Sequence, residues 1–269
     1  MPDTTHQATD GQAIRVERRG AIGLITLNRP DRINAINDAI RSGLSHALAD
    51  LDASSEIRVI VLHGGAGRGF CAGADITERR APRNPVATRA AMGAGSWIDA
   101  FDRCTTPIVA AIHGFCLGGG FEIALACDIR IASRDATFAL PETGLGLIPG
   151  AGGTQRLPRL VGMGRALDLM LTGDRIDAAE ALRIGIVTRM VEDPARLLDE
   201  ALALAERIAA RAPAATLYVK EAALSGSDLP LAAGLALERS LFALLSGTAD
   251  KTEAGRAFAE KRPPRFTGE

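Results

Sequence analysis

Two glutamates, Glu122 and Glu142, are the residues of this chain best suited to acid–base chemistry. Glu122 follows three glycines in an otherwise apolar segment, where burying a carboxylate costs free energy unless a partner or water compensates. Glu142 follows Pro141 and precedes a glycine-rich loop. Two carboxyl groups in a mostly apolar pocket can have their pKa values set apart, so that one activates water and the other delivers a proton. The pair therefore predicts an acid–base site.

Each glutamate also has a purely structural interpretation. Glu122 lies near the start of a predicted helix, where a negative charge stabilises the helix dipole. Glu142 is compatible with an exposed charge on a loop. The choice between the two interpretations depends on what the neighbouring loops can supply to a reacting molecule.

Two loops of small residues could supply backbone N–H groups to a carbonyl oxygen. The first runs through Phe70–Asp75 after a predicted strand, and the second, Gly118–Gly120, lies between a predicted strand and a helix. In this position the amide of Gly119 would point along the helix N-terminus, so one amide from each loop would form an oxyanion hole. The glycines could instead form a tight turn, or a phosphate-binding loop. No Gly-x-Gly-x-x-Gly or Gly-Lys-Ser/Thr pattern supports the phosphate alternative.

Other catalytic chemistries have weaker support. Cys71 is a potential nucleophile, but no Cys/His arrangement can be argued from the sequence, and we interpret it as a small packing residue. No Ser lies in a Gly-x-Ser-x-Gly turn. The four histidines have no metal-ligand spacing, and no His-Glu-x-x-His occurs, so we expect no metal site.

Composition narrows the class of protein. A chain of 269 residues with a net charge of -1 does not suggest binding to nucleic acid or to an anionic membrane. Four widely spaced cysteines without a Cys-x-x-Cys pair are typical of a reduced protein. The first 11 residues lack the apolar stretch of a secretory signal, and no apolar run reaches the roughly 18 residues of a membrane span. We expect a soluble cytoplasmic enzyme.

The hydrophobic pattern predicts strands alternating with helices, followed by a series of helices. Strands are expected over 14–19, 22–27, 57–62, 108–112, 128–132, 137–140 and 186–191. Helices are expected over 38–51, 86–104, 121–127, from about 154, and over 194–211, 213–224, 229–245 and 249–261. This order indicates an α/β core built from repeated ββα or βα units, with a helical C-terminal part.

Leucines crowd one broad face of the predicted helix at 229–245. They are Leu231, Leu235, Leu237, Leu241, Leu244 and Leu245. A face this apolar requires a partner, which we expect to be an adjacent subunit, although the core of the same chain is an alternative.

Two long motifs resemble the enoyl-CoA hydratase (crotonase) family. The first, 111–128, reads AIHGFCLGGGFEIALACD, and the second, 141–157, reads PETGLGLIPGAGGTQRL. The similarity extends from Ile14 to Phe266 and includes the shorter matches AGAD, LTG and FAEK. The resemblance implies a crotonase-like spiral of repeated ββα units with a helical C-terminal trimerisation region. We expect a disordered or extended tail over 1–12, the spiral core over 13–200 and the helical C-terminal region over 201–269.

The resemblance also implies roles for individual residues. It makes Glu122 and Glu142 the catalytic pair, the amides of Ala72 and Gly119 the oxyanion hole, and Gly150 part of the pocket near the water. Contacts with coenzyme A are expected from Arg32, Ala72, Gly73, Ala74, Asp75, Gly119 and, through a neighbouring subunit, Lys261. Arg32 departs from the family, since many relatives have Lys or a non-basic residue there.

The activity implied by this resemblance is the addition of water across the 2,3-double bond of trans-2-enoyl-CoA, giving 3-hydroxyacyl-CoA in fatty acid metabolism. Both glutamates are present, which favours hydration over Δ3,Δ2-enoyl-CoA isomerisation or another crotonase-type reaction on acyl-CoA. An RNA-binding or scaffold role is a remote alternative, against which the near-neutral charge argues. The family implies a coenzyme A thioester as substrate with no tightly bound cofactor, and a homotrimer or dimer of trimers without nucleic-acid or membrane partners.

Overall fold

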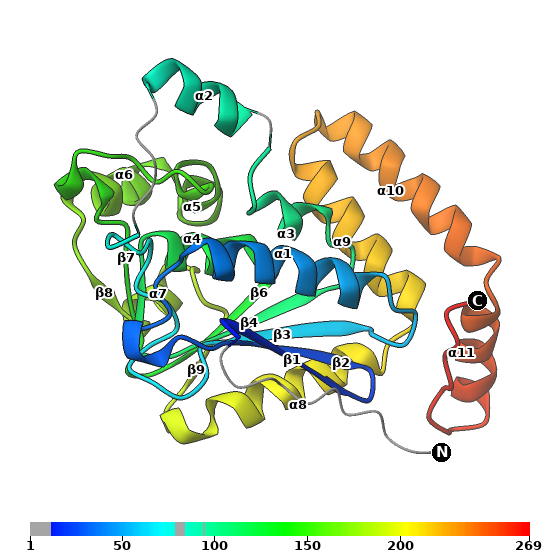
Figure 1. Ribbon diagram of the computed structural model, residues 1–269. Coiled ribbons are helices and arrows are strands. Elements are labelled where there is room, and N and C mark those ends of the chain that lie inside the picture. Colours follow the sequence, from blue (N-terminus) through cyan, green and yellow to red (C-terminus); the bar gives the residue numbers. More distant parts are fainter. Residues whose placement is uncertain (1–11, 79–83, 94) are drawn as a thin grey trace.

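A computed structural model describes residues 12–78, 84–93 and 95–269 of the chain. Its centre is a six-stranded sheet with the order β1-β2-β3-β4-β6-β9 (Figure 1). β1 and β2 form an antiparallel hairpin, and the remaining neighbours are parallel. The strands are β1 (Ile14–Arg19), β2 (Ile22–Leu27), β3 (Val59–His63), β4 (Ile108–Ile112), β6 (Ile129–Ser133) and β9 (Arg189–Val191). The apolar runs thus predicted each of these strands to within about two residues at most ends, except that β9 is shorter than expected.

Helices cover both faces of this sheet, because its central strands are apolar on both sides. Val59 and Val61 of β3 belong to a cluster with Leu204 and other residues of α8 (Leu197–Ala209). Ile60 of β3 points the other way and joins the larger cluster with Ile40 of α1 (Asp38–Asp52). The same large cluster includes buried residues of α3 (Asp99–Arg103) and α4 (Gly119–Ala126).

A second, three-stranded sheet determines where the two glutamates lie. Its order is β5-β7-β8, formed by β5 (Phe115–Leu117), β7 (Thr137–Ala139) and β8 (Ile176–Asp177). β5 and β7 are parallel, with Leu117 opposite Ala139, and the amide of Gly118 donates to the carbonyl of Ala139 at 2.9 Å. The segments that follow the two strands, α4 and the 3-10 helix η2 (Glu142–Leu145), therefore begin side by side.

The structure corrects two predictions of local structure. The expected helix over 86–104 is two helices, α2 (Pro85–Gly93) and α3, because Gly95 adopts a φ of +117° that no helix accommodates. β5 lies within a stretch that we expected to be a loop, since three residues are too few to show a strand period.

Of the other helices, the short one at Pro30–Arg32 was not predicted, and the rest fall, apart from their ends, within the segments expected to be helical. These other helices are η1 (Pro30–Arg32), α5 (Gly153–Val161), α6 (Met163–Thr172), α7 (Ala178–Arg183), η3 (Pro194–Arg196), α9 (Pro213–Ser227), α10 (Leu231–Ser246) and α11 (Ala249–Ala259). The expected core boundary at residue 200 falls inside α8, and α8 packs on the sheet, so the core continues to about residue 209.

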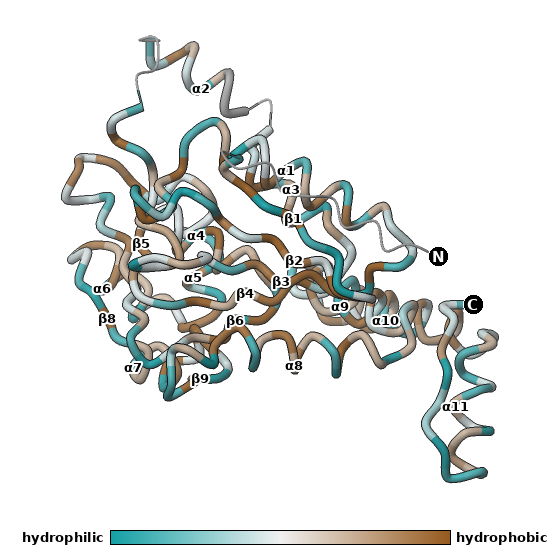
Figure 2. The backbone as a smooth tube through the Cα atoms, turned by 60° about the horizontal axis from the view of Figure 1, so that its bottom comes forward, coloured by the Kyte–Doolittle hydropathy of each residue, from teal (hydrophilic) through white to brown (hydrophobic). Residues whose placement is uncertain are grey.

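Helices α9, α10 and α11 extend from the core (Figure 1). α10 packs against α9, and the two backbones approach closely where Gly226 meets Gly234. Of the α10 residues only Leu241 is buried, whereas Leu231 is 77% exposed. Leu237 and Leu245 are partly buried, so the chain itself covers one part of the leucine-rich face, whereas Leu231, Leu235 and Leu244 remain exposed. Figure 2 shows apolar residues concentrated in the central sheet and α8, with α11 projecting away from them.

Among the described residues, no single helix is long and apolar enough to cross a membrane, although α10 and α11, bent by 68°, together have the length and composition to do so.

Candidate active site

Glu122 is held by the N-terminus of a neighbouring helix. It lies in the first turn of α4, and only 3% of the residue is exposed. Its Oε1 accepts hydrogen bonds from the amides of Ala151, at 2.7 Å, and Gly153, at 2.8 Å. Gly153 is the first residue of α5, so the carboxylate lies at the positive end of that helix dipole. These contacts fix one oxygen of Glu122 and leave the other for chemistry.

Glu142 is the first residue of η2, and its side chain extends toward the same site. Its Oε1 lies 3.0 Å from the position that a Cβ on Gly118 would occupy. Gly118 has a φ of +52°, so a glycine is favoured there both by backbone conformation and by the closeness of the carboxyl group. The Oε2 of Glu142 is buried, and no hydrogen-bond partner for it is found among the described residues.

Both carboxyl groups have raised pKa values. Burial raises the pKa of Glu122, while the amides of Gly153 and Ala151 and the charge of Arg156 oppose that shift. Burial also raises the pKa of Glu142, and the negative charge of Glu122 raises it further. The hydrogen bonds favour the ionised form at Glu122, and the unpartnered oxygen favours the protonated form at Glu142.

Ala72 does not supply a free amide to this site, contrary to the sequence-based expectation. Its N–H donates to the carbonyl of Ile33 at 2.9 Å, and the amide of Cys71 before it donates to Phe115. A donor already committed to a backbone carbonyl cannot also stabilise a developing oxyanion without breaking that bond. The amide of Ala72 is therefore not available as an oxyanion donor in this structure.

The available amide of this loop belongs to Ala74. The carbonyl of Gly73 and the amide of Asp75 both bond to Ile36, so the N–H of the intervening Ala74 points away from Ile36. Within the described part of the chain, no acceptor is found for this N–H, and Ala74 is exposed. A Cβ on Gly119 would lie 3.9 Å from Ala74 N and 4.0 Å from Glu122 Oε2. Gly119 begins α4, so its amide has no acceptor within the helix.

A buried asparagine fixes the loop that carries Ala74. Asn34 donates from Nδ2 to the carbonyls of Gly64, at 2.8 Å, and Phe70, at 2.9 Å. Its Oδ1 accepts a hydrogen bond from the amide of Arg29 at 2.8 Å. Asn34 and Ile33 both have positive φ, which brings the carbonyl of Ile33 against Ala72. The pattern of the sequence did not indicate this role.

Cys71 is confirmed as a packing residue. It is fully buried, its Sγ donates to the carbonyl of Asn34, and burial raises the pKa of the thiol to about 12. A Cβ on Gly120 would lie 2.4 Å from the Cys71 carbonyl oxygen. The third glycine of the triplet is therefore explained by close packing of the two loops.

The other residues that we expected to contact substrate or coenzyme A lie in several different places. Gly73 is buried, and Gly150 is exposed next to the loop that binds Glu122. Asp75 turns its carboxylate toward Arg29 and Thr77, so it orders the loop. Arg32 is exposed at the end of η1. Lys261 follows α11, which lies on the opposite side of the chain from η2, α5 and α6 (Figures 1 and 2). Within one chain Lys261 therefore does not join the glutamates.

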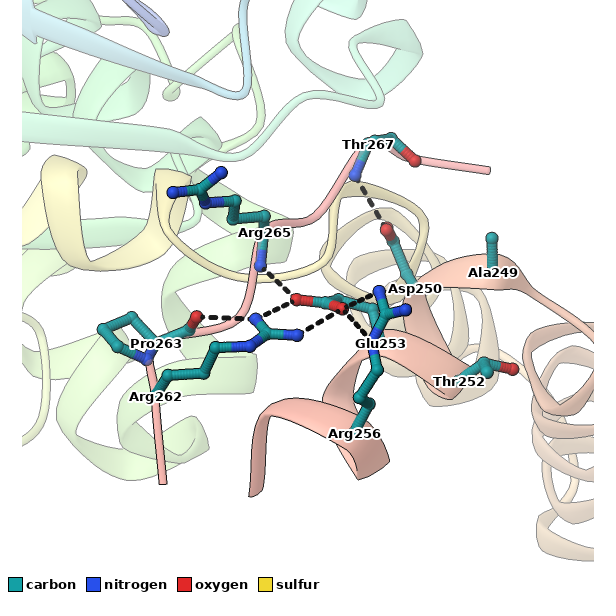
Figure 3. Close-up of a pocket in the computed structure, with 9 residues that line it drawn as sticks. All are labelled: Ala249, Asp250, Thr252, Glu253, Arg256, Arg262, Pro263, Arg265 and Thr267. Atoms are coloured by element: carbon teal, nitrogen blue, oxygen red, sulfur yellow. Dashed lines mark hydrogen bonds and ion pairs between the residues drawn. The ribbon is translucent and has the colours of Figure 1, made fainter. Parts of the chain in front are cut away.

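A cavity of about 970 Å³ lies at the C-terminal end, away from the glutamates. Figure 3 shows its lining by α11 and the tail that follows, with Glu253 bound by Arg262 and Arg256. The tail amides of Thr267 and Gly268 bond to Asp250. The carboxylates of this cavity thus tie the tail to α11.

Comparison with known proteins agrees with the fold. The profile of the enoyl-CoA hydratase/isomerase family matches residues 17–269. A Rhizobium meliloti protein named "Probable enoyl-CoA hydratase" is 46% identical over 95% of this chain and 98% of its own length. The short-chain-enoyl-CoA hydratase of Clostridium acetobutylicum is 39% identical over 92% of this chain and 94% of its own. The crystal structure of a Bacillus anthracis enoyl-CoA hydratase, also 39% identical, superposes with a TM-score of 0.90 over 96% of this chain and 100% of its own.

The fold is that of the crotonases. The chain belongs to the enoyl-CoA hydratase/isomerase family, whose members act on coenzyme A thioesters.

Proposed function

We propose that this enzyme is an enoyl-CoA hydratase that adds water across the 2,3-double bond of trans-2-enoyl-CoA and forms 3-hydroxyacyl-CoA. The observation that carries the proposal is the presence of two carboxyl groups in different environments beside one pair of amides. Glu122 has one oxygen fixed by Ala151 and Gly153, and Glu142 has a buried oxygen without a partner among the described residues. An isomerase requires only one such group, whereas hydration uses both a base and an acid.

The proposed reaction uses the carbonyl oxygen of the thioester as its electron sink. That oxygen accepts hydrogen bonds from the amides of Ala74 and Gly119. These bonds stabilise the negative charge that develops on the oxygen as the enolate forms. The free oxygen of Glu122 removes a proton from water while the water oxygen bonds to C3. The electron pair of the double bond moves toward C2, and protonated Glu142 delivers its proton there. Return of one proton from Glu122 to Glu142 restores the starting state.

The electrostatics of the site support this division of roles. A carboxylate that accepts two amide hydrogen bonds at a helix N-terminus is stabilised in its ionised form, as a base must be. A carboxyl group that is buried beside another negative charge holds its proton, as an acid must. Thus Glu122 is assigned as the base and Glu142 as the acid.

We further propose that the chain assembles as a homotrimer or a dimer of trimers. The exposed apolar residues of α10 support this, since a neighbouring subunit would cover them. The side chains are Leu231, Leu235, Phe242 and Leu244. In such an assembly Lys261 of a neighbouring copy would contact coenzyme A, with Arg32 supplying a contact from the same chain. A cytoplasmic location is supported by the wide spacing of the cysteines. A role in fatty acid metabolism is consistent with an enoyl-CoA substrate.

Substitution of each glutamate tests the proposal. Purified Glu122→Gln and Glu142→Gln should each lose hydration of crotonyl-CoA by about 100- to 10,000-fold, the range of general acid–base catalysis. Glu206→Gln, an exposed position on α8, is the matched control and should retain full activity. Near wild-type hydration by both site variants would contradict the mechanism. Consumption of 3-enoyl-CoA without hydration of 2-enoyl-CoA by the wild-type enzyme would instead make it an isomerase.

A further inference from the structure

An ion pair between two helices lies directly behind the loop that holds Glu122. Arg156 of α5 donates from Nη2 to both carboxylate oxygens of Asp102 of α3, at 2.6 and 2.7 Å. Only 22% of the Arg156 side chain is exposed, compared with 58% of Asp102. Neither side chain takes part in the chemistry proposed above. Their position suggests a different contribution.

The guanidinium of Arg156 also contacts the backbone of this loop. Its Nη1 donates to the carbonyl of Ala151 at 3.2 Å. A Cβ on Gly152 would lie 1.8 Å from the same Nη1, so the guanidinium packs directly against the Gly152 backbone. Gly152 has a φ of +104°, a conformation that side-chain-bearing residues rarely adopt. Arg156 thus occupies the space that a side chain at Gly152 would need.

The same short segment presents its other side to Glu122. The amides of Ala151 and Gly153 flank Gly152 and both donate to Glu122 Oε1. Ala151 therefore has its carbonyl held by Arg156 and its amide bound to the proposed base. Two linked hydrogen bonds through one residue connect the ion pair to the carboxylate. The orientation of the two amide donors depends on where Arg156 holds the loop.

We propose that Arg156, anchored by Asp102, is a positioning residue that fixes the Ala151–Gly153 loop so that Glu122 is oriented and kept ionised. This inference rests on the proposed role of Glu122 as the base. The amides of Gly153 and Ala151 lower the pKa of Glu122, and the positive charge of Arg156 lowers it as well. Both effects oppose the increase caused by burial.

An arginine suits this position better than a lysine. Its planar group has several donors in fixed directions, so it can bond to Asp102 with one nitrogen and to Ala151 with another. A lysine would keep the charge but not both contacts. The variants Arg156→Lys and Arg156→Met therefore separate the charge from the geometry, and Asp102→Asn removes the anchor while keeping its shape.

The experiment measures kcat and KM for crotonyl-CoA against pH for these variants and the wild type. Arg156→Met should lower kcat by about 10- to 100-fold, the cost of a misplaced catalytic group, with KM changed by no more than about twofold. The acid limb of its kcat/KM profile should move to higher pH, because the loss of a nearby positive charge raises the pKa of Glu122. Arg156→Lys keeps the positive charge, so its acid limb should lie closer to that of the wild type than the acid limb of Arg156→Met does. Its kcat should recover less, because the lysine cannot make both contacts.

Matched controls come from an exposed ion pair. Arg134 and Glu192 pair at 2.7 Å with 72% and 63% of their side chains exposed, so Arg134→Met and Glu192→Gln should leave kcat and the pH limb unchanged. Thermal unfolding checks that each variant is folded. If Arg156→Met does not fold, Asp102→Asn and Arg156→Lys provide the same readouts.

The possible outcomes separate the inference from the proposed function. If the wild type hydrates crotonyl-CoA and the Arg156 and Asp102 variants keep its kcat and acid limb, the positioning role is wrong and the hydratase activity stands. A loss of kcat in proportion to folded protein, with an unmoved acid limb, would make Arg156 merely structural and would also overturn the inference. A wild type without hydratase activity would overturn the proposed function itself.

Discussion

The amide nitrogen of Ala74 and the backbone of Gly119 face the same small space: a Cβ on Gly119 would lie 3.9 Å from that nitrogen. The same Cβ would lie 4.0 Å from Glu122 Oε2 and 2.9 Å from Ile36 Cδ1. Gly119 thus borders an amide donor, the proposed base and the side chain of Ile36. A side chain at this position would enter the space meant for the thioester oxygen.

Replacing Gly119 with alanine should therefore impair catalysis more than folding. The added methyl group would leave the amide of residue 119 in place but crowd the proposed position of the thioester oxygen, and we expect kcat for crotonyl-CoA to fall by up to about 100- to 1,000-fold, the cost of losing an oxyanion-hole contact. The measurement is steady-state hydration together with thermal unfolding of the same preparation. Gly164→Ala is the matched control, because a Cβ there would meet nothing within 4 Å. Equal activities of the two variants would remove Gly119 from the oxyanion hole.

The pH dependence of hydration should be bell-shaped. In the proposed mechanism only the pair with one proton is active, with Glu122 ionised and Glu142 protonated. Because burial raises the pKa of Glu122, kcat/KM should fall on the acid side at a pH above the ordinary glutamate value of about 4.3. The raised pKa of Glu142 keeps its proton up to a higher pH, and the rate should fall again once that proton is lost. A rate unchanged across the whole range in which the protein stays folded would contradict this pairing.

Asn34 should contribute to stability through the loop that carries Ala74. Asn34→Ala leaves the carbonyls of Gly64 and Phe70 buried without their donor, and we expect a loss of about 2 to 4 kcal/mol in the free energy of unfolding. Urea-induced unfolding of wild type and variant measures this difference. Asn28→Ala is the control, since its Nδ2 makes a single exposed hydrogen bond, to Gln12. A cost no larger than that of the control would show that the loop does not depend on Asn34.

The C-terminal tail should be released by acid. Arg262, Arg256 and the amide of Arg265 hold the pKa of Glu253 well below its usual range (Figure 3). A lowered pKa means that the contribution of Glu253 to stability is present above about pH 4.3 and is lost as the pH falls toward the folded-state value. Glu253→Gln should remove the same contribution at neutral pH.

Hydrogen exchange measures this release. The amide of Arg265, which donates to Glu253 Oε1 at 2.9 Å, should exchange faster in Glu253→Gln than in the wild type. Glu260→Gln is a matched control, because Glu260 also pairs with Arg262 but is 52% exposed. Unchanged exchange at Arg265 would show that Glu253 does not anchor the tail.

The sequence was sufficient to predict the main sheet and to single out the two glutamates that the fold brings close together. Apolar runs such as 57–62 and 108–112 predict buried strands because a strand covered on both faces is apolar throughout. Glu122 and Glu142 are identified by their motifs and by the cost of a carboxylate among apolar residues. Their proximity depends on β5 and β7, of which only β7 was expected.

What the sequence could not resolve depends on contacts between distant segments. Ala72 and Ala74 are alike in the sequence, and only the approach of Ile33 and Ile36 decides which of the two amides remains available. The role of Arg156 likewise depends on Asp102, which lies 54 positions away. No pattern within a single segment reports such pairings.

Isotope uptake from solvent tests whether this enzyme adds water across the 2,3-double bond. Wild-type enzyme is incubated with crotonyl-CoA in deuterated water enriched in heavy oxygen, and the product is analysed by mass spectrometry and NMR. If Glu122 activates water and Glu142 protonates C2, each product molecule should carry one heavy oxygen on C3 and one deuterium on C2, and both Gln variants should form this product far more slowly. A product with deuterium but no heavy oxygen, or no uptake of either label, would contradict hydration at this site.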